Sequence, residues 1–345
     1  METTSQTTQH PALFLGIDVG KSDLFCHLIG PDEVCSERFD NAAKGIKSLT
    51  AWLSKITAHR PFAACLEQTG HYGDAIAQAL YDTQPSGIYQ VNPHRIKAFG
   101  MQKLRRNKSD TADAKLIARF IKSEHPELRP WQPKSSDQLR ITALSRYAES
   151  LTQDAARCKT MLESQSDKTI VACLKRQIKA AQKESKALRT EISKLIKAAP
   201  QLQTQSELIQ SIPGLGPVST QIVIAELPDL AQFEDARQLA AWAGLTPQHH
   251  SSGTSGKTQT PITKIGSVHL RRGLFMPAMT ARVYNPLLKE FGDRLKLNGK
   301  SPKQIIVAIM RKLLHQIYGI LKSGMPYDPN KRGFQNAKVT PSAIS

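Results

Sequence analysis

"ALFLGIDVGKSDLFCHLIG", residues 12–30, decides the fold of the first part of the chain. Its apolar run breaks at residues 18–20 and resumes as "LFCHLIG", a pattern typical of two strands joined by a turn. Helical spacing follows at residues 44–56, and a short apolar run follows at residues 61–67. "GIYQVNP" then predicts another strand, and "DTADAKLIARFI" predicts another helix. This alternation predicts an α/β domain.

The composition is that of a folded and strongly basic protein. Apolar residues make up 40% of the 345 positions, which is enough to build buried cores. The 47 Lys and Arg exceed the 29 Asp and Glu, and the net charge is +18. This surplus favours a polyanionic partner, with nucleic acid ahead of an anionic membrane and a generically basic protein as the bland alternative. After residue 260 the sequence has fifteen Lys and Arg but only three acidic residues, which indicates that the C-terminal part binds nucleic acid.

Several classes of protein are disfavoured. The five cysteines are scattered and form no CxxC pair, which argues against a disulfide framework and a zinc ribbon. The first residues lack the basic and apolar regions of a signal peptide, and no apolar run approaches the roughly 20 residues of a membrane span. We therefore expect a cytoplasmic protein that associates with the nucleoid when active.

Residues 138–199 contain neither Gly nor Pro and are rich in charge. A seam of mostly apolar residues follows a spacing of four and three along this segment: Leu174, Ile178, Ala181, Ser185, Leu188, Ile192 and Leu195. This heptad spacing predicts a coiled-coil hairpin or long paired helices, for which self-association is the usual reason. A helical bundle within one chain is the alternative.

"SIPGLGPVSTQIVIAEL", residues 211–227, resembles a helix-hairpin-helix turn. The backbone N–H groups at Gly214 and Gly216, together with the start of the next helix, are suited to holding a phosphate. The segments beyond it have helical spacing, so the C-terminal part should be mostly helical. The expected divisions are a disordered start at 1–11, an α/β domain at 12–135, a helical coiled-coil spacer at 136–203, a mostly helical domain at 204–330 and a disordered tail at 331–345.

Four carboxylates form the most informative set. Asp18 and Glu67 each end a predicted strand, while Asp110 and Asp113 lie three apart on a predicted helix and so share one face. Each has an ordinary explanation, such as a turn residue for Asp18 or a helix N-cap for Asp110. In this order within an α/β region, however, they match how an RNase H-like fold builds a two-metal site, because carboxylate oxygens are the ligands that Mg²⁺ prefers.

With these residues in view, the sequence resembles the insertion-sequence transposases that pair a RuvC-like DEDD domain with a C-terminal serine domain. That family includes bridge-RNA-guided recombinases and the related pilin-gene invertases. The stretches that carry the resemblance run in order over nearly the whole chain: "GIDVGKSDLFCHL", "LEQTGHYG", "VNPHRIKAF", "RNKSDTADAKLIARF", "SIPGLGPVSTQIVIAEL", "ARQLAAWAGLTP", "SSGTSGKT", "ITKIGSVHLRRGLFMPAM" and "KLLHQIYGILKSGMPYD".

The resemblance implies an N-terminal RuvC/RNase H-like mixed-sheet domain and a DNA recombinase that uses Mg²⁺, with Mn²⁺ as a substitute. The residues that match the metal-binding tetrad are Asp18, Glu67, Asp110 and Asp113. A serine followed by glycine, a few residues past "GLTP", is the family's nucleophile, and Ser252 before Gly253 matches it, with Ser255 as second choice. The resemblance implies a covalent phosphoserine intermediate and does not single out His249 or His250.

The implied partners are donor and target DNA, a structured guide RNA and further copies of the chain, as a dimer or tetramer. No zinc finger or basic zipper is present to read bases, which suits a target choice delegated to RNA. The basic residues expected to contact phosphates, for each of which a solvated surface is an equal alternative, are Lys103, Arg105, Arg106, Lys108, Lys257, Arg271 and Arg272.

Other functions fit parts of the pattern. A site-specific DNA invertase of the same family would use the same residues. A RuvC-like structure-specific endonuclease would need the carboxylates but not the serine loop, and a non-catalytic nucleic-acid scaffold would need neither.

Overall fold

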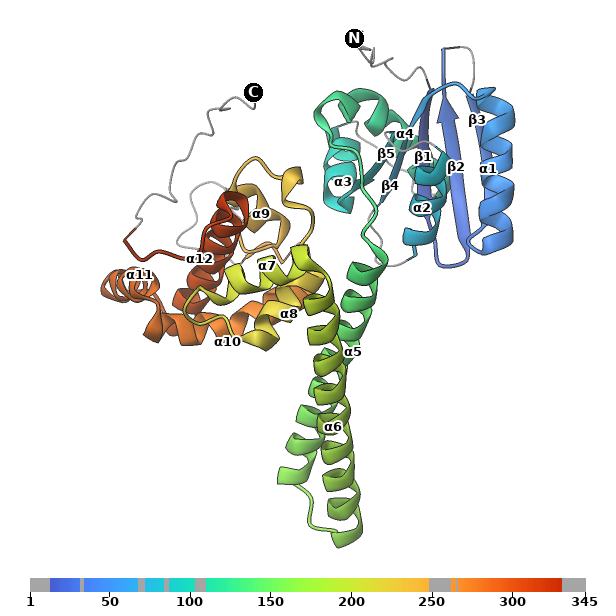
Figure 1. Cartoon of the computed structure of the whole chain (residues 1–345). Helices are drawn as coiled ribbons and strands as arrows, with labels where there is room; N and C mark the ends of the chain where they lie inside the picture. The colour runs from blue at the N-terminus through green and yellow to red at the C-terminus, as the bar shows by residue number, and fades with distance from the viewer. Residues whose placement is uncertain are drawn as a thin grey trace, which may run out of the picture. The chain divides into compact units, whose positions relative to one another are not determined.

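The computed structural model describes residues 13–31, 34–67, 72–83, 87–102, 110–247, 262–264 and 266–330, apart from the side chains of His94, Gln102 and Asp110. The termini expected to be disordered, residues 1–11 and 331–345, lie outside this part of the chain. The chain divides into two compact units, and the boundary falls between Lys134 and Ser135 (Figure 1).

The first unit is built on a five-stranded mixed sheet. Its strands are β1 (Leu13–Val19), β2 (Asp23–Ile29), β3 (Val34–Asp40), β4 (Phe62–Glu67) and β5 (Ile88–Val91). Their order across the sheet is β3-β2-β1-β4-β5. The first three strands pair antiparallel as a meander, and β4 and β5 join β1 in parallel. Each of these parallel connections carries a helix, since strands that pair in parallel need a long crossover.

Helices cover both faces of this sheet. Helices α1 (Ala43–Thr57) and α2 (Asp74–Thr83) pack on one face through buried residues such as Leu49 and Ile76. Helices α3 (Pro93–Gln102) and α4 (Asp110–Glu124) pack on the other face, and the 3₁₀ turn His125–Glu127 follows α4. The two cores are separate because successive residues of each strand point to opposite faces.

The second unit begins with a long helical hairpin formed by α5 (Ser136–Glu163) and α6 (Lys168–Ala198) (Figure 1). Arg140 near the start of α5 hydrogen-bonds Glu191 near the end of α6, and Cys158 near the end of α5 reaches Gln177 near the start of α6. The two helices are therefore antiparallel.

The heptad seam of α6 is its covered side. Leu174, Ser185 and Ile192 are buried, and the other four seam residues are half-buried. Ser185, the polar member of the seam, donates its hydroxyl to the Ala148 carbonyl of α5 at 3.1 Å, which satisfies the hydroxyl inside the hairpin. Much of the apolar spacing is thus used within one chain.

The rest of the second unit is helical. It comprises α7 (Pro200–Gln210), α8 (Pro217–Glu226), the 3₁₀ turn Leu230–Gln232, α9 (Ala236–Trp242), α10 (Val268–Tyr284), α11 (Pro286–Leu297) and α12 (Pro302–Ser323). One core of buried Leu, Ile and Ala side chains joins these helices to the near ends of α5 and α6. The predicted fold class, a mixed-sheet α/β domain followed by a mostly helical part, is confirmed. All five cysteines are free, and no helix in the described ranges is both long and apolar enough to cross a membrane.

Candidate active site

Two of the four predicted carboxylates end neighbouring parallel strands. β1 and β4 pair in register as far as Ile17 and Leu66, and Asp18 and Glu67 are the next residue of each strand. Residues in register point to one face of a sheet and successive residues alternate, so both carboxylates leave the sheet opposite Ile17 and Leu66. Both are half-buried. The sheet register therefore places them side by side, on the face that α4 covers.

Helix α4 crosses β1 at Gly16, where a side chain has no room. A β-carbon on Gly16 would lie 2.2 Å from the backbone nitrogen of Ala118 and 2.3 Å from the carbonyl oxygen of Ala114. Only glycine allows two backbones to approach this closely. The glycine in "GID" thus holds α4 against the strand that carries Asp18.

The direction of α4 follows from the contacts at its two ends. Ala114, near the start of the helix, lies over Gly16, whereas the ring of His125, directly after the helix, lies 5.3 Å from the ring of Phe14 between centroids. Because Phe14 precedes Gly16 on β1, the helix runs antiparallel to the strand. It therefore begins towards the end of β1 that carries Asp18.

The second carboxylate pair lies at this beginning of α4. Asp110 is the first residue of the helix and Asp113 is in its first turn, where Asp113 is half-buried. Among the side chains that the structure describes, no three His, Cys, Asp or Glu lie close enough together to hold a metal ion; the side chain of Asp110 is outside that set. The predicted basic residues that precede the pair also lie outside the described residues: Lys103, Arg105, Arg106 and Lys108.

A buried histidine lies on the same face as these carboxylates. His27 of β2 pairs with Gly16, is 4% exposed, and its Nδ1 hydrogen-bonds the Ser36 hydroxyl at 2.7 Å. Burial lowers the pKa of His27, and the charges of Lys115 and Arg119 on α4 lower it further. The imidazole is therefore a neutral member of the α4 packing.

In the second unit, the segment that contains the predicted nucleophile starts and ends at one backbone bridge. Pro247 and Ile262 form an isolated antiparallel bridge, and the Thr263 N–H donates to the Thr246 carbonyl at 3.0 Å. Residues 248–261 lie between these paired positions and outside the described residues, with Ser252, Gly253 and Lys257 among them. The bridge fixes the two ends of the segment together.

Arg271 holds the base of this segment. Its Nη1 donates to the carbonyls of Ala243 and Gly266, each at 3.0 Å. Gly266 has φ of 110°, and a β-carbon there would lie 1.8 Å from the Trp242 carbonyl oxygen, so the tight path from the bridge into α10 requires glycine. The predicted phosphate ligand Arg271 thus directs part of its guanidinium to the end of α9 and the start of α10.

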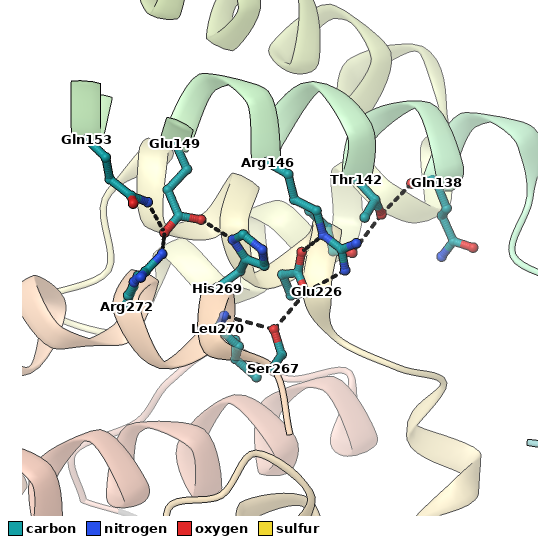
Figure 2. Close-up of polar contacts among 11 residues, drawn as sticks. Gln138, Thr142, Arg146, Glu149, Gln153, Glu226, Ser267, His269, Leu270 and Arg272 are labelled. Atoms are coloured by element: carbon teal, nitrogen blue, oxygen red, sulfur yellow. Dashed lines mark hydrogen bonds and ion pairs between the residues drawn. The ribbon is translucent and has the colours of Figure 1, made fainter. Parts of the chain in front are cut away.

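An ion pair with a buried carboxylate ties α5, α8 and the start of α10 together (Figure 2). Arg146 of α5 donates from Nε and Nη2 to the two carboxylate oxygens of Glu226, at 2.7 and 3.1 Å. Ser267, the N-cap of α10, donates to the same carboxylate at 2.7 Å and accepts from the Leu270 N–H. Burial raises the pKa of Glu226, but these hydrogen bonds outweigh burial and leave the pKa below its usual value.

A second carboxylate, Glu149, lies on α5 one turn after Arg146. Glu149 accepts hydrogen bonds from the ring of His269, from Gln153 at 3.1 Å and from Arg272 at 3.5 Å, as Figure 2 shows. Its side chain is 13% exposed, whereas that of Arg272 is 54% exposed. The guanidinium of Arg272 therefore combines an intramolecular contact with an open side.

Comparisons with known proteins match this chain along its length. Residues 206–293 match the model described as "Transposase IS116/IS110/IS902 family", and residues 15–170 match the model of the DEDD domain of IS110 transposases, described as "Transposase". The "Pilin gene-inverting protein" of Moraxella bovis is 33% identical over 321 residues, which cover 91% of this chain and 97% of the relative. The chain belongs to the IS116/IS110/IS902 transposase family. It is therefore an enzyme of the transposase and recombinase class, and the resemblance read from the sequence is confirmed.

Two further likenesses are more limited. This transposase is 27% identical over 159 residues to the "Insertion element IS110 uncharacterized 43.6 kDa protein" of Streptomyces coelicolor, which is 46% of this chain and 38% of the relative. A solved structure of T. thermophilus RuvC in complex with a Holliday junction substrate matches with a TM-score of 0.27 and 16% identity, over 34% of this chain and 96% of that chain.

The glycines of the predicted phosphate-binding turn differ in their surroundings in this transposase. Gly214 has φ of 107°, and a β-carbon there would lie 2.7 Å from the Ala281 β-carbon of α10. Both the backbone conformation and the packing against α10 therefore require glycine, with no need for a ligand. A β-carbon added to Gly216, the N-cap of α8, would have no neighbouring atom within 4 Å. The backbone at Gly216 is open to a ligand, whereas Gly214 has a structural role.

Sequence reasoning missed the network that joins the helices of the transposase. Arg146, Glu226 and Ser267 are separated by tens of residues, and no local spacing connects them. A signal for Glu226 does exist, because a single carboxylate ends the otherwise apolar run "IVIAEL" and a charge buried in such a helix needs a partner. The identity of that partner comes only from the tertiary structure.

Proposed function

We propose that this chain is the DNA transposase of an insertion sequence, which cuts and rejoins DNA by transesterification. The observation that carries the proposal is the placement of Asp18 and Glu67 on adjacent parallel strands, with the helix of Asp110 and Asp113 beginning towards the same edge. The similarity over 91% of the chain to a protein named for inverting a gene supports DNA as the substrate.

The four carboxylates are the proposed ligands of Mg²⁺, with Mn²⁺ as a substitute. The donor chemistry fits, since the carboxylate oxygens of Asp18, Glu67, Asp110 and Asp113 are hard ligands, and the strand ends and the start of α4 that carry these residues lie towards one edge of the sheet. When bound, divalent ions would offset the negative charge that develops on a phosphodiester. The contribution of the protein is to hold Asp18, Glu67 and Asp113, each half-buried, on elements that the sheet register and the packing of α4 fix in place.

Ser252 is the proposed nucleophile. Its Oγ forms a bond to the DNA phosphorus, the bond from phosphorus to the leaving DNA oxygen breaks, and the serine proton is matched by the proton taken up on the freed hydroxyl. A hydroxyl of the other DNA then attacks the phosphoserine and releases Ser252 unchanged. One phosphoester replaces another in each step, so no external energy source is needed.

The architecture around the serine segment supports this role. The bridge between Pro247 and Ile262 and the contacts of Arg271 hold both ends of the segment, while its Ser, Thr and Gly composition suits close approach to a phosphate. A plain interdomain linker has no need of such a closure.

We also propose that a structured RNA guides the transposase to its target. The net charge of +18 and the lack of a base-reading motif in the sequence support this. RNA should co-purify with the protein from cells that carry the native flanking DNA, and nuclease removal of that RNA should abolish recombination. Full recombination by RNA-free protein would contradict guidance.

The working state is proposed to be a dimer or tetramer in which the serine of one copy enters the carboxylate site of another. Mixing the Ser252→Ala and Asp18→Asn variants should then restore recombination, because each copy supplies what the other lacks. A mixture as inactive as either variant alone would show that each copy completes its own site.

A plasmid recombination assay tests the chemistry against the other functions. Ser252→Ala and Asp18→Asn should each fall below about one-thousandth of the parent, since nucleophile and activating groups act as a unit, whereas the matched Ser255→Ala control should stay active. Cleavage that survives Ser252→Ala would favour a RuvC-like endonuclease. DNA binding with no cleavage under any condition would favour a scaffold. The products distinguish a transposase from an invertase: excision and insertion against inversion of one segment.

A further inference from the structure

A groove in the second unit is lined by none of the proposed catalytic residues. It lies between the α5–α6 hairpin and the start of α8, and its volume is about 510 Å³. Its lining brings together residues from three helices: Thr152, Ala155, Ala156 and Lys159 of α5; Gln182, Ser185, Lys186, Arg189, Thr190 and Ser193 of α6; and Pro217, Val218 and Gln221 of α8.

The chemistry of the lining is one-sided. Three cations, Lys159, Lys186 and Arg189, line the groove together with hydroxyl and amide groups, and none of the lining residues in the described part of the chain carries a carboxylate. Lys159 and Lys186 are exposed on facing helices. A hollow that holds three positive charges and uncharged hydrogen-bonding groups is complementary to a chain of phosphates.

Two buried polar atoms of the lining have unmet hydrogen-bonding capacity. Arg189 Nη1, a donor, and Gln221 Oε1, an acceptor, bond to no residue that the structure describes. Gln221 is 5% exposed, and its Nε2 is fixed by the Arg189 carbonyl at 2.9 Å and the Ser193 hydroxyl at 2.8 Å. Buried polar atoms are nearly always satisfied, so an acceptor for Arg189 and a donor for Gln221, such as a bridging water, are expected from outside.

The amino end of α8 adds a third element. Its N-cap is Gly216, which has no side chain to accept from the first-turn N–H groups, and Pro217 follows. The space beside Gly216 is open. The partial positive charge of a helix start favours an anion at this position.

We infer that this groove binds the sugar–phosphate backbone of the DNA substrate, with Lys159, Lys186 and Arg189 contacting phosphates. The inference rests on the proposed function for the identity of the nucleic acid. It goes beyond that function by assigning a further DNA contact to the hairpin, through residues that take no part in the proposed chemistry. Because all its contacts are to the backbone, the groove adds affinity without sequence preference.

The test is the salt dependence of binding by the full-length protein to a fluorescent duplex of its own flanking DNA. Each phosphate contact contributes about 0.9 to the slope of log affinity against log salt. Lys186→Ala should lower this slope by about 0.9, and the double change with Lys159→Ala by about 1.8. From 50 to 200 mM salt, the parent should therefore lose roughly 3.5-fold more affinity than Lys186→Ala.

The matched control is Lys168→Ala, which removes an exposed lysine at the start of the same helix that does not line the groove. It should leave the slope unchanged, since Lys168 is roughly 27 Å along the helix from Lys186 at about 1.5 Å per residue, and screening limits a distant charge to about 8 Å at physiological salt. Equal slopes for the parent, Lys168→Ala and Lys186→Ala would overturn the inference. A changed slope for RNA of the same sequence, with an unchanged slope for DNA, would overturn the assignment to DNA.

The outcome is separable from that of the proposed chemistry. Ser252→Ala should bind DNA with the slope of the parent, because the serine makes no ionic contact. If recombination failed to depend on Ser252 while the Lys186 effect held, the chemistry would be wrong and the groove would stand. If recombination depended on Ser252 while Lys186→Ala left the salt slope unchanged, the proposed chemistry would stand and the assignment of the groove would be wrong.

Discussion

Gly16 of β1 lies directly against the backbone of Ala118 in α4, with 2.2 Å between the position of an added β-carbon and the Ala118 nitrogen. This contact holds the helix of Asp110 and Asp113 on the strand of Asp18. The arrangement of the carboxylates thus depends on a residue that has no side chain.

Gly16→Ala should lower the free energy of unfolding of the first unit by about 3 kcal/mol, because a backbone must move to admit the methyl group. Urea unfolding of the full chain measures this. Gly73→Ala, where the added carbon would have contacts of 3.9 Å or more, is the control and should cost less than about 0.5 kcal/mol. Equal effects of the two changes would contradict the close packing of α4 on β1.

Replacing only one partner of the ion pair between Arg146 and Glu226 should lower the free energy of unfolding of the second unit. The Glu226 side chain is 3% exposed and that of Arg146 is 47% exposed. Arg146→Met leaves a buried carboxylate without its main partner and should cost about 2 kcal/mol or more, with the exposed side of Arg146 moderating the loss. The double variant Arg146→Met/Glu226→Leu should be more stable than Arg146→Met alone. A double variant that shows the plain sum of two losses would contradict a coupled pair.

Arg271 distinguishes a positioning role from a phosphate contact. Its Nη1 contacts to Ala243 and Gly266 predict that Arg271→Lys lowers recombination by at least about tenfold, since a misplaced reactive group costs rate. Because lysine keeps the positive charge, the phosphate contact is tested with Arg271→Met, whose DNA affinity and salt slope should stay near those of the parent. A slope reduced by about 0.9 in Arg271→Met would instead identify Arg271 as a phosphate ligand.

His315 of α12 makes the stability of the second unit depend on pH. Burial, together with the charges of Lys312 and Arg311, lowers the pKa of His315 to about 4. The unfolded chain, with a pKa near 6.5, takes up a proton that the folded chain does not, so the contribution of neutral His315 is complete above pH 6.5 and is lost as the pH falls towards 4.

Thermal melting of the parent and of His315→Gln from pH 7 to pH 4 tests this dependence. The melting temperature of the parent should fall more steeply than that of the variant, because glutamine has no proton to gain. Melting temperatures of the parent and the variant that fall in parallel with pH would show that groups other than His315 account for the loss of stability in acid.

The arrangement of the first unit was largely predictable because its signals are local. The break at Asp18–Gly20 and the end of the run at Glu67 mark strand ends directly. Strand β3 gave no comparable signal: it is an edge strand, most of its side chains are exposed, and its sequence "VCSERFD" has no apolar alternation. Edge strands are stabilised by pairing with a neighbour more than by burial.

The second unit was predictable in its helices and not in its contacts. Residues 138–199 gave the long hairpin through composition and spacing, but nothing local linked Arg146 to Glu226 or Glu149 to His269. Arg271 shows the limit most clearly. A basic residue near the serine segment was expected to face DNA, and two backbone carbonyls that no spacing reveals determine where part of its guanidinium points.

The most direct test of the account is a covalent trap. The transposase is expressed with its native flanking DNA, cells are lysed under denaturing conditions, and protein attached to DNA is digested and mapped by mass. We predict a nucleotide remnant on Ser252 that is absent from Asp18→Asn. Efficient strand cleavage without any adduct, undiminished in Ser252→Ala, would contradict the account.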